Sequence, residues 1–240
     1  MLIASLLVLW EISARWGWIV SENWPPVTQI AKALIGAMSS GELLFAMLAT
    51  LYRVILGFAM GSVLAVALGV LLGRSPLADR LIRPPIEVLR TMPGPAILPP
   101  LILLLGVEEA LKVTVISLAS FFPVFVNAYA GVKGTDFTLL DTARTFRLGR
   151  SVTLRRMLLP AALPSIMAGM RISISIALTV AVIAEMISGA SGVGYFLMSM
   201  QYAMRADVMY AAVALLAVVG YALNRIFVAV EGRVLFWRSR

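Results

Sequence analysis

Residues 141–160, DTARTFRLGRSVTLRRMLLP, form the longest strongly basic stretch between two apolar blocks of the chain. An arginine is costly at the centre of a bilayer, and this stretch contains five of them: Arg144, Arg147, Arg150, Arg155 and Arg156. The stretch therefore predicts an element that lies at a membrane surface. A solvated basic loop is the alternative.

The same region carries a helical pattern. Leu139, Ala143 and Phe146 are spaced i, i+4 and i+7, which places them on one face of a helix. Asp141 and Arg144 are three residues apart and can pair on the exposed side of that helix. We expect a short amphipathic helix that leaves a few apolar side chains available to a partner.

The composition indicates an all-α, polytopic membrane protein. The 240 residues are 61% hydrophobic and 13% charged, with a mean hydropathy of +0.96, whereas a soluble domain is about half apolar and about a quarter charged. The chain has no histidine and no cysteine. This excludes a histidine base, a cysteine nucleophile, disulfides and histidine or cysteine metal ligands, and we expect no catalytic residue and no metal site. The net charge of +8 is explained by basic loops between apolar runs rather than by nucleic-acid binding.

The apolar runs predict a single transmembrane domain over residues 1–240 with about six spans. They lie at residues 1–18, 43–73, 84–106, 111–132, 161–187 and 208–230. The first is short, because a span needs about 20 apolar residues. Basic residues gather in the loops of one side, so the positive-inside rule places both termini and the segment 136–160 in the cytoplasm.

Two of these spans carry small residues at every fourth position. Such a ridge lets another helix approach closely, which is how helices pack in lipid. In the second span the ridge consists of Gly57, Gly61, Ala65, Gly69 and Gly73. In the fifth span it consists of Ser165, Gly169, Ser173, Ala177 and Ala181, and the next position in the row is Glu185.

The third predicted span is rich in proline. We expect its first half to be irregular, because proline removes a backbone donor and clashes with the preceding turn; its prolines are Pro84, Pro85, Pro93, Pro95, Pro99 and Pro100. A broken helix lining a pathway and a buried kink are both compatible with this pattern. Glu87 and Arg90 are within reach of each other near its start.

Six residues of the spans are candidates for a translocation pathway or gate: Glu185, Arg53, Glu87, Arg90, Pro93 and Pro95. Glu185 is either such a residue or a hydrogen-bonded structural carboxylate, because an isolated carboxylate on a packed helix is expensive. Arg53 and Arg90 could favour an anion, but arginines near membrane interfaces more commonly extend their head groups to water.

No phosphate-binding G-x-x-x-x-G-K-[ST] motif occurs. If the protein performs energised work, another subunit must supply the energy, and a cytoplasmic docking element is then expected.

The basic stretch resembles the signature of permease subunits of binding-protein-dependent ABC importers. That signature reads Glu-Ala-Ala, three residues, Gly, nine residues, Ile, one residue, Leu-Pro. The corresponding places are taken by Asp141, Thr142, Ala143, Arg147, Met157, Leu159 and Pro160. Arg147 stands where the signature has glycine, and a glycine follows at Gly149, so we expect the sharp turn to be shifted or altered.

The resemblance extends over nearly the whole chain. Residues 51–75, 84–106, 159–173 and 184–196 are similar to the nitrate, sulfonate and taurine type of permease. This implies a type I ABC importer permease fold in a bacterial inner membrane, and a homodimer with two cytoplasmic ATPase subunits and an extracytoplasmic solute-binding protein. The partners other than lipid are thus proteins, and ATP and Mg²⁺ would be bound by the ATPase rather than by this chain.

The implied function is import of a small solute, often an anion, by alternating access, with no enzymatic activity in this chain. The residues implied in ATPase coupling are Asp141, Thr142, Ala143, Arg144, Phe146, Arg147, Gly149, Leu159 and Pro160. Phe146 would fill a groove of the ATPase while the arginines pair with acidic groups around it. The alternative is an ion-coupled secondary transporter that uses Glu185 with Arg53 or Arg90.

Overall fold

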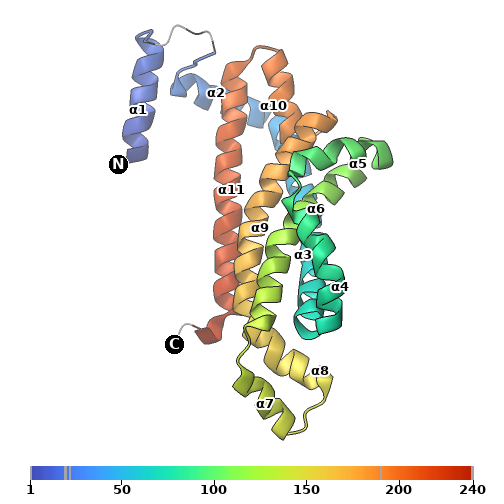
Figure 1. Ribbon diagram of the computed structural model, residues 1–240. Helices are drawn as coiled ribbons and strands as arrows, with labels where there is room; N and C mark the ends of the chain where they lie inside the picture. The colour runs from blue at the N-terminus through green and yellow to red at the C-terminus, as the bar shows by residue number, and fades with distance from the viewer. Residues whose placement is uncertain (1, 19–20, 22, 190, 239–240) are drawn as a thin grey trace. The chain divides into compact units, whose positions relative to one another are not determined.

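A computed structural model describes residues 2–18, 21, 23–189 and 191–238 of the chain. The regular elements of this described part are all helices (Figure 1). They form two compact units, the first made of Met1–Tyr52 and Val182–Ala222, and the second of Arg53–Ala181 and Leu223–Arg240. The predicted all-α class is therefore confirmed.

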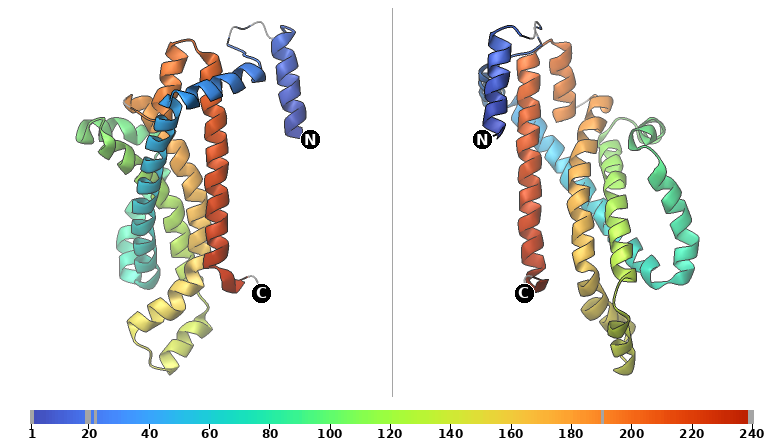
Figure 2. Two further views of the ribbon diagram at one scale, coloured as in Figure 1. Left: turned by 180° about the vertical axis from the view of Figure 1, so that it is seen from behind. Right: turned by 60° about the vertical axis from the view of Figure 1, so that its left-hand side comes forward.

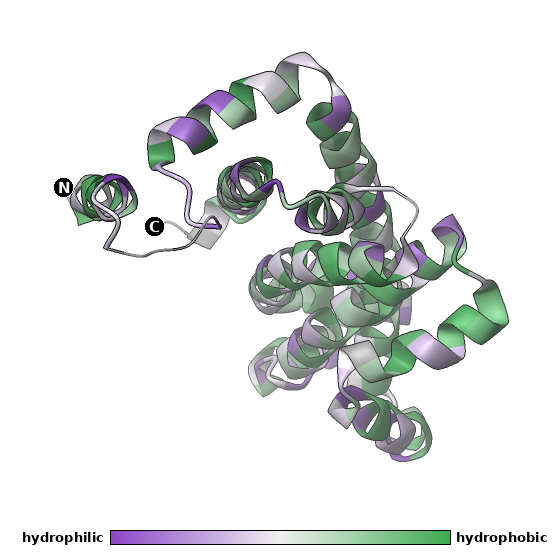
Figure 3. Cartoon of the chain, turned by 90° about the horizontal axis from the view of Figure 1, so that it is seen from above, coloured by the Kyte–Doolittle hydropathy of each residue, from purple (hydrophilic) through white to green (hydrophobic). Residues whose placement is uncertain are grey.

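Four helices in the described residues are long and apolar enough to cross a membrane. They are α3 (Glu42–Arg74), α6 (Glu109–Lys133), the helical stretch Arg150–Ser188, which contains α9 (Leu159–Ser188), and α11 (Ala206–Val234). These helices match the predicted spans at 43–73, 111–132, 161–187 and 208–230. Figure 3 shows hydrophobic residues, in green, along much of the chain, and large apolar side chains such as Phe45, Val63, Ile172 and Val218 are exposed along the four long helices. Such surfaces are expected to face lipid.

The other two predicted spans are occupied by shorter helices. The first is α1 (Leu2–Arg15), which has 14 residues and is followed by α2 (Val27–Ser39). Residues 84–106 are divided among α4 (Pro76–Thr91), the 3₁₀ helix η1 (Gly94–Ile97) and α5 (Leu98–Leu105).

The expectation that Pro84 and Pro85 interrupt regular structure is wrong, because both lie inside α4. Both are exposed, so their rings do not have to be accommodated in the core. The helix ends later, at Thr91, and its C-cap residue Met92 has an extended ψ of 132°. Pro93 follows Met92, and a residue before proline is driven out of the helical region by the proline ring.

In the second unit, the glycine ridge of α3 lies against α6. A Cβ placed on Gly57 would be 2.6 Å from Ile116 Cγ2, and one on Gly69 would be 2.7 Å from the Cβ of Ala128. Gly61 is backed by the carbonyl oxygen of Ser117, Gly73 is backed by Val132, and Ala65 is fully buried. The spacing of small residues therefore brings two helix backbones into direct contact.

The row of small residues on α9 also lies against α6. A Cβ on Gly169 would be 2.7 Å from the Cβ of Asn127. The Ser173 hydroxyl donates to the carbonyl of Ser120 at 2.8 Å, and the Ser165 hydroxyl donates to the carbonyl of Asn127 at 2.8 Å. Close packing and inter-helix hydrogen bonds thus occur together at this interface.

The first unit has its own apolar core. It is built around Leu43 and Met47 of α3, Val193 and Phe196 of α10 (Val193–Tyr202), and Val208 and Ala212 of α11. Nearby, the ring of Trp10 on α1 stacks on Trp24 with centroids 4.6 Å apart and meets the edge of Tyr210. These aromatic contacts join α1 to α11 within the unit.

Candidate functional site

The predicted amphipathic helix is α7 (Phe137–Thr145), in the second unit. Asp136 caps it, since its Oδ1 accepts a hydrogen bond from the backbone N–H of Thr138 at 2.9 Å. This bond to the charged form lowers the pKa of Asp136. Both views in Figure 2 show α7 and the following short helix α8 (Arg150–Thr153) beyond the ends of α6 and α9. The sequence pattern thus produces a short capped helix in this position.

The predicted apolar face of α7 is buried only in part. Ala143 is buried, whereas Phe146, at the C-terminal end, is 72% exposed. The Arg144 guanidinium is 3.0 Å from an Asp141 carboxylate oxygen, and both side chains are exposed. The pair lies in water, so it contributes little to stability. The exposed Phe146 is the unusual feature, because a large aromatic side chain gains by burial.

The sharp turn after α7 stays at Arg147, so the expected shift toward Gly149 does not occur. Arg147 has a φ of 51°, in the left-handed region. Its N–H bonds to the Arg144 carbonyl, and the N–H of Leu148 bonds to the Ala143 carbonyl, both at 2.9 Å. This is the Schellman arrangement, in which glycine normally takes the left-handed position. Arg147 therefore adopts the conformation that the signature glycine would have, while Gly149 has an ordinary φ of −64°.

The segment re-enters the unit through α8 (Arg150–Thr153) and a π-helix, η2 (Leu154–Leu158), which leads directly into α9. The N–H of Leu159 bonds to the carbonyl of Leu154, five residues back. A proline ring clashes with the carbonyl four residues before it in a regular helix, so Pro160 favours a wider turn here.

Apolar side chains anchor this segment to the long helices. Leu158 is buried with Val132, Ala128, Ala162 and Ile166, and Leu140 and Leu154 pack against them. The five arginines of the segment are exposed. The segment therefore has an inner face fixed to α6 and α9 and an outer face that is basic, with Phe146 projecting from it.

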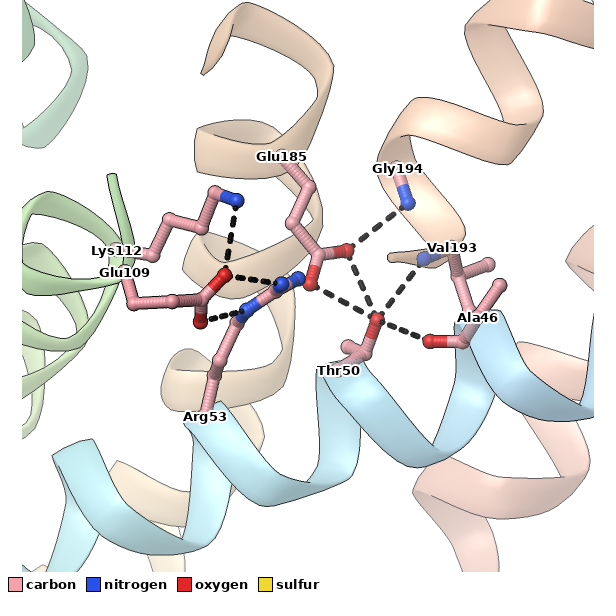
Figure 4. A network of polar contacts seen from close by, with 8 residues as sticks. All are labelled: Ala46, Thr50, Arg53, Glu109, Lys112, Glu185, Val193 and Gly194. Atoms are coloured by element: carbon pink, nitrogen blue, oxygen red, sulfur yellow. Dashed lines mark hydrogen bonds and ion pairs between the residues drawn. The ribbon is translucent and has the colours of Figure 1, made fainter. Parts of the chain in front are cut away.

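In the first unit, Glu185 is completely buried and hydrogen-bonded (Figure 4). The Thr50 hydroxyl lies 2.8 and 2.9 Å from the two carboxylate oxygens, and the N–H of Gly194 donates to Oε2 at 3.0 Å. Thr50 also accepts from the N–H of Val193 at 2.9 Å. Thr50 and Glu185 thus satisfy the first N–H groups of α10, where the helix dipole also favours a negative charge.

Gly192 is required by this arrangement. Its φ of 99° favours glycine, and a Cβ at this position would collide with the carboxylate of Glu185. The backbone therefore approaches the carboxylate more closely than any side chain permits.

In the second unit, Arg53 is 3% exposed and forms a two-pronged ion pair with Glu109 (Figure 4). Its Nε and Nη2 lie 2.7 and 2.6 Å from the two Glu109 oxygens. Lys112, 1% exposed, is 3.3 Å from the same carboxylate. Arg53 does not extend to water as arginines near interfaces commonly do, because Glu109 offers a partner in the fold.

Sequence reasoning missed the roles of Glu109 and Lys112. A local signal was present, since an acid and a lysine three residues apart open an otherwise apolar helix. The pairing with Arg53 had no such signal, because the partners are 56 residues apart.

Glu87 pairs with Arg83 at 2.7 Å, and no bond between Glu87 and Arg90 is found in the described part of the chain. Arg83 also donates to the Tyr129 hydroxyl, which donates to Asp79. These contacts fasten α4 to the end of α6, and they draw Glu87 away from Arg90.

Arg90 borders a cavity beside the break between α4 and η1. Pro93 lies in that break, and Pro95 lies in η1. Within the described residues, no group of three or more histidine, cysteine, aspartate or glutamate residues could hold a metal ion.

Comparison with known proteins relates this chain to inner membrane components of transport systems. Residues 57–236 match the family described as "Binding-protein-dependent transport system inner membrane component". A putative aliphatic sulfonates transport permease protein, SsuC, of Bacillus subtilis (strain 168) is 32% identical over 98% of this chain and 86% of its own length. The taurine transport system permease protein TauC of Escherichia coli (strain K12) is 29% identical over 99% of this chain and 88% of its own length.

Solved structures show the same fold. An inward-facing MetNI methionine ABC transporter superposes with a TM-score of 0.71 and 18% identity, covering 80% of this chain and 95% of that one. An amino acid ABC transporter with histidines superposes with a TM-score of 0.64 and 18% identity, covering 86% and 98%.

Proposed function

The chain belongs to the family of binding-protein-dependent transport system inner membrane components, and on this premise we propose that it imports a small organic anion by alternating access. It is the multi-pass permease subunit of an ABC importer, and ATP hydrolysis lies in a separate subunit. Membership of this family favours the ABC importer over the alternative hypothesis from the sequence, an ion-coupled secondary transporter. The substrate class is supported by relatives named for aliphatic sulfonates and taurine.

The observation that carries the coupling part of the proposal is the exposed Phe146 on a basic surface. An aromatic side chain surrounded by polar groups is typical of an interface anchor that enters a pocket of its partner. Phe146 is 72% exposed, and Arg144 and Arg147 beside it are exposed as well. In this proposal Phe146 enters a groove of the ATPase, and the arginines meet acidic groups at its rim.

The inner face of the segment supports transmission of movement. Leu154 and Leu158 pack on the ends of α6 and α9, so a displacement of the segment is passed to these helices. Packed elements move as rigid bodies rather than deforming continuously. Segment 136–160 therefore acts as the coupling element, with Asp141, Thr142, Ala143, Leu159 and Pro160 setting its shape and Gly149 capping the start of α8.

The proposed assembly has two copies of this chain, two ATPase subunits on the cytoplasmic side and a solute-binding protein on the opposite side. Both termini and the coupling segment face the cytoplasm, in agreement with the distribution of basic residues. In this assembly ATP and Mg²⁺ are bound by the ATPase subunits. Glu185 and Arg53 serve as structural charges that hold their helices, since each has bonded partners within its own unit.

The test compares Phe146→Ala with Phe137→Ala, which removes an equally exposed ring from the other end of α7. Loss of a buried aromatic anchor costs about 2 kcal/mol or more, or about thirtyfold in affinity. We expect Phe146→Ala to lose the co-purifying ATPase and vanadate-sensitive uptake of a labelled alkanesulfonate, and Phe137→Ala to retain both.

Asp141→Lys provides a second test of the same surface, because it reverses a charge without touching the ring. We expect it also to abolish transport while the permease remains in the membrane. Undiminished ATPase and normal uptake in both Phe146→Ala and Asp141→Lys would contradict the docking assignment.

A further inference from the structure

A cavity of about 270 Å³ lies in the second unit beside the break between α4 and η1. Its wall is mostly apolar: α6 contributes Val115, Leu118 and Phe122, and α9 contributes Ile176 and Val180. Cavities for drug-sized ligands measure about 300–1,000 Å³. The volume here therefore suits a smaller solute.

The cavity lies at membrane depth. Leu118 is nine residues from the start of α6, which corresponds to about 14 Å along a helix of about 37 Å. Ile176 is 17 residues from the start of α9, or about 26 Å along a helix of about 45 Å. Both positions lie well inside helices that are long and apolar enough to cross a membrane.

The opposite wall is the broken helix. α4 ends at Thr91, and the chain continues through Met92 and η1, both of which border the cavity. Irregular backbone at membrane depth is tolerated where it is buried in protein or lines a water-filled space, and discontinuous helices commonly mark substrate sites. The break between α4 and η1 therefore borders the cavity in the way that discontinuous helices border substrate sites.

Arg90 alone is charged among the described residues that line this cavity. Glu87, one turn earlier, is bonded to Arg83, and no hydrogen bond or ion pair of Arg90 is found in the described part of the chain. Arg90 is exposed, so its guanidinium is accessible to a solute in the cavity, and arginines that face a water-filled cavity among membrane helices mark ion or substrate pathways. Its planar donors match the oxygens of an oxyanion in pairs.

We infer that this cavity is a subsite on the translocation pathway for a small aliphatic oxyanion, with Arg90 pairing with the anionic group. This inference rests on the proposed function and adds the place and the selectivity of binding. The apolar wall covers the aliphatic part of the solute, whereas an inorganic anion gains nothing from it. Each methylene group that enters the cavity raises affinity about fourfold.

The experiment measures binding of alkanesulfonates, from methanesulfonate to butanesulfonate, to the full chain assembled with its ATPase in lipid nanodiscs. Inorganic sulfate is the comparison probe. We expect affinity to rise with chain length, and Arg90→Gln to weaken butanesulfonate binding about tenfold or more. Arg80→Gln removes an equally charged side chain from the same helix at a position that does not line the cavity, and it should change this affinity less than twofold.

Two further variants guard against misfolding as an explanation. Arg90→Lys keeps a positive charge and should lose less affinity than Arg90→Gln. Ala119→Leu fills part of the cavity and should weaken butanesulfonate more than methanesulfonate. Equal binding by Arg90→Gln and Arg80→Gln, no dependence on chain length, or no binding to the wild-type chain would overturn the subsite.

A measurement of uptake distinguishes failure of the subsite from failure of the proposed function on which the subsite rests. Vanadate-sensitive uptake by the wild-type transporter, with binding that ignores Arg90, would refute the subsite alone. Absence of ATP-driven uptake of any alkanesulfonate would refute the proposed substrate class.

Discussion

Replacing Arg147 with glycine should stabilise the end of α7. Arg147 has a φ of 51°, and a side chain in the left-handed region costs about 1–2 kcal/mol because Cβ crowds the following carbonyl oxygen. Glycine removes that strain but loses about 0.5–1 kcal/mol more backbone entropy on folding. The difference predicts a gain of about 0.5–1 kcal/mol. No side-chain bond of Arg147 to another described residue would be lost.

Amide hydrogen exchange measures this effect where it occurs. The N–H of Leu148 bonds to the Ala143 carbonyl at 2.9 Å only while the turn is formed. Its protection should therefore rise about twofold to fivefold in Arg147→Gly. Arg144→Gly is the control, because glycine inside a helix costs about 1 kcal/mol and protection should fall.

The opposite outcome would refute the reasoning. If Arg147→Gly lowered the protection of Leu148, the turn would be held by something other than its backbone conformation. Arg147→Val sharpens the test, since a β-branched residue is the least tolerant of a positive φ. Unchanged protection in Arg147→Val would show that the left-handed turn does not form in solution.

Two other predictions concern the first unit and the start of α7. Gly192→Ala should lower the midpoint of thermal unfolding more than Gly189→Ala, since both have positive φ but only a Cβ at Gly192 meets the Glu185 carboxylate; equal shifts would show that the contact is unimportant. Because the pKa of Asp136 is lowered, its capping bond contributes to stability above the ordinary value of 3.8 and is lost as the pH falls through the folded-state pKa. A spin label on α7 should therefore become more mobile in acid, and Asp136→Asn, which still accepts a hydrogen bond, should remove that pH step.

The sequence alone predicted those features in which a local residue pattern determines the structure through bilayer thickness or helix geometry. Hydropathy located the four long helices, because the bilayer sets their length. The spacing of Gly57, Gly69 and Gly73 indicated close packing, because residues four apart share one helix face. In the coupling segment, the pair of Asp141 and Arg144 followed from the same rule.

The features that were not predicted depend on distant residues or on exposure. Arg53 is buried because Glu109 lies next to it in the fold, and no local pattern joins these two positions. Pro84 and Pro85 are tolerated in α4 because they are exposed, which a proline count does not reveal. Arg147 shows that a signature position can keep its backbone conformation without its usual residue.

The π-helix at Leu154–Leu158 lies between α8 and α9. Without it, these two helices would form one continuous α-helix. A π turn contains one residue more than the corresponding stretch of α-helix, so it acts as a tolerated insertion. Removing a residue there would turn the preceding basic segment by about 100° around the axis of α9 while leaving the membrane-embedded part of that helix unchanged. The direction in which the segment faces its partner can therefore evolve by a single-codon deletion, independently of the helix that follows it.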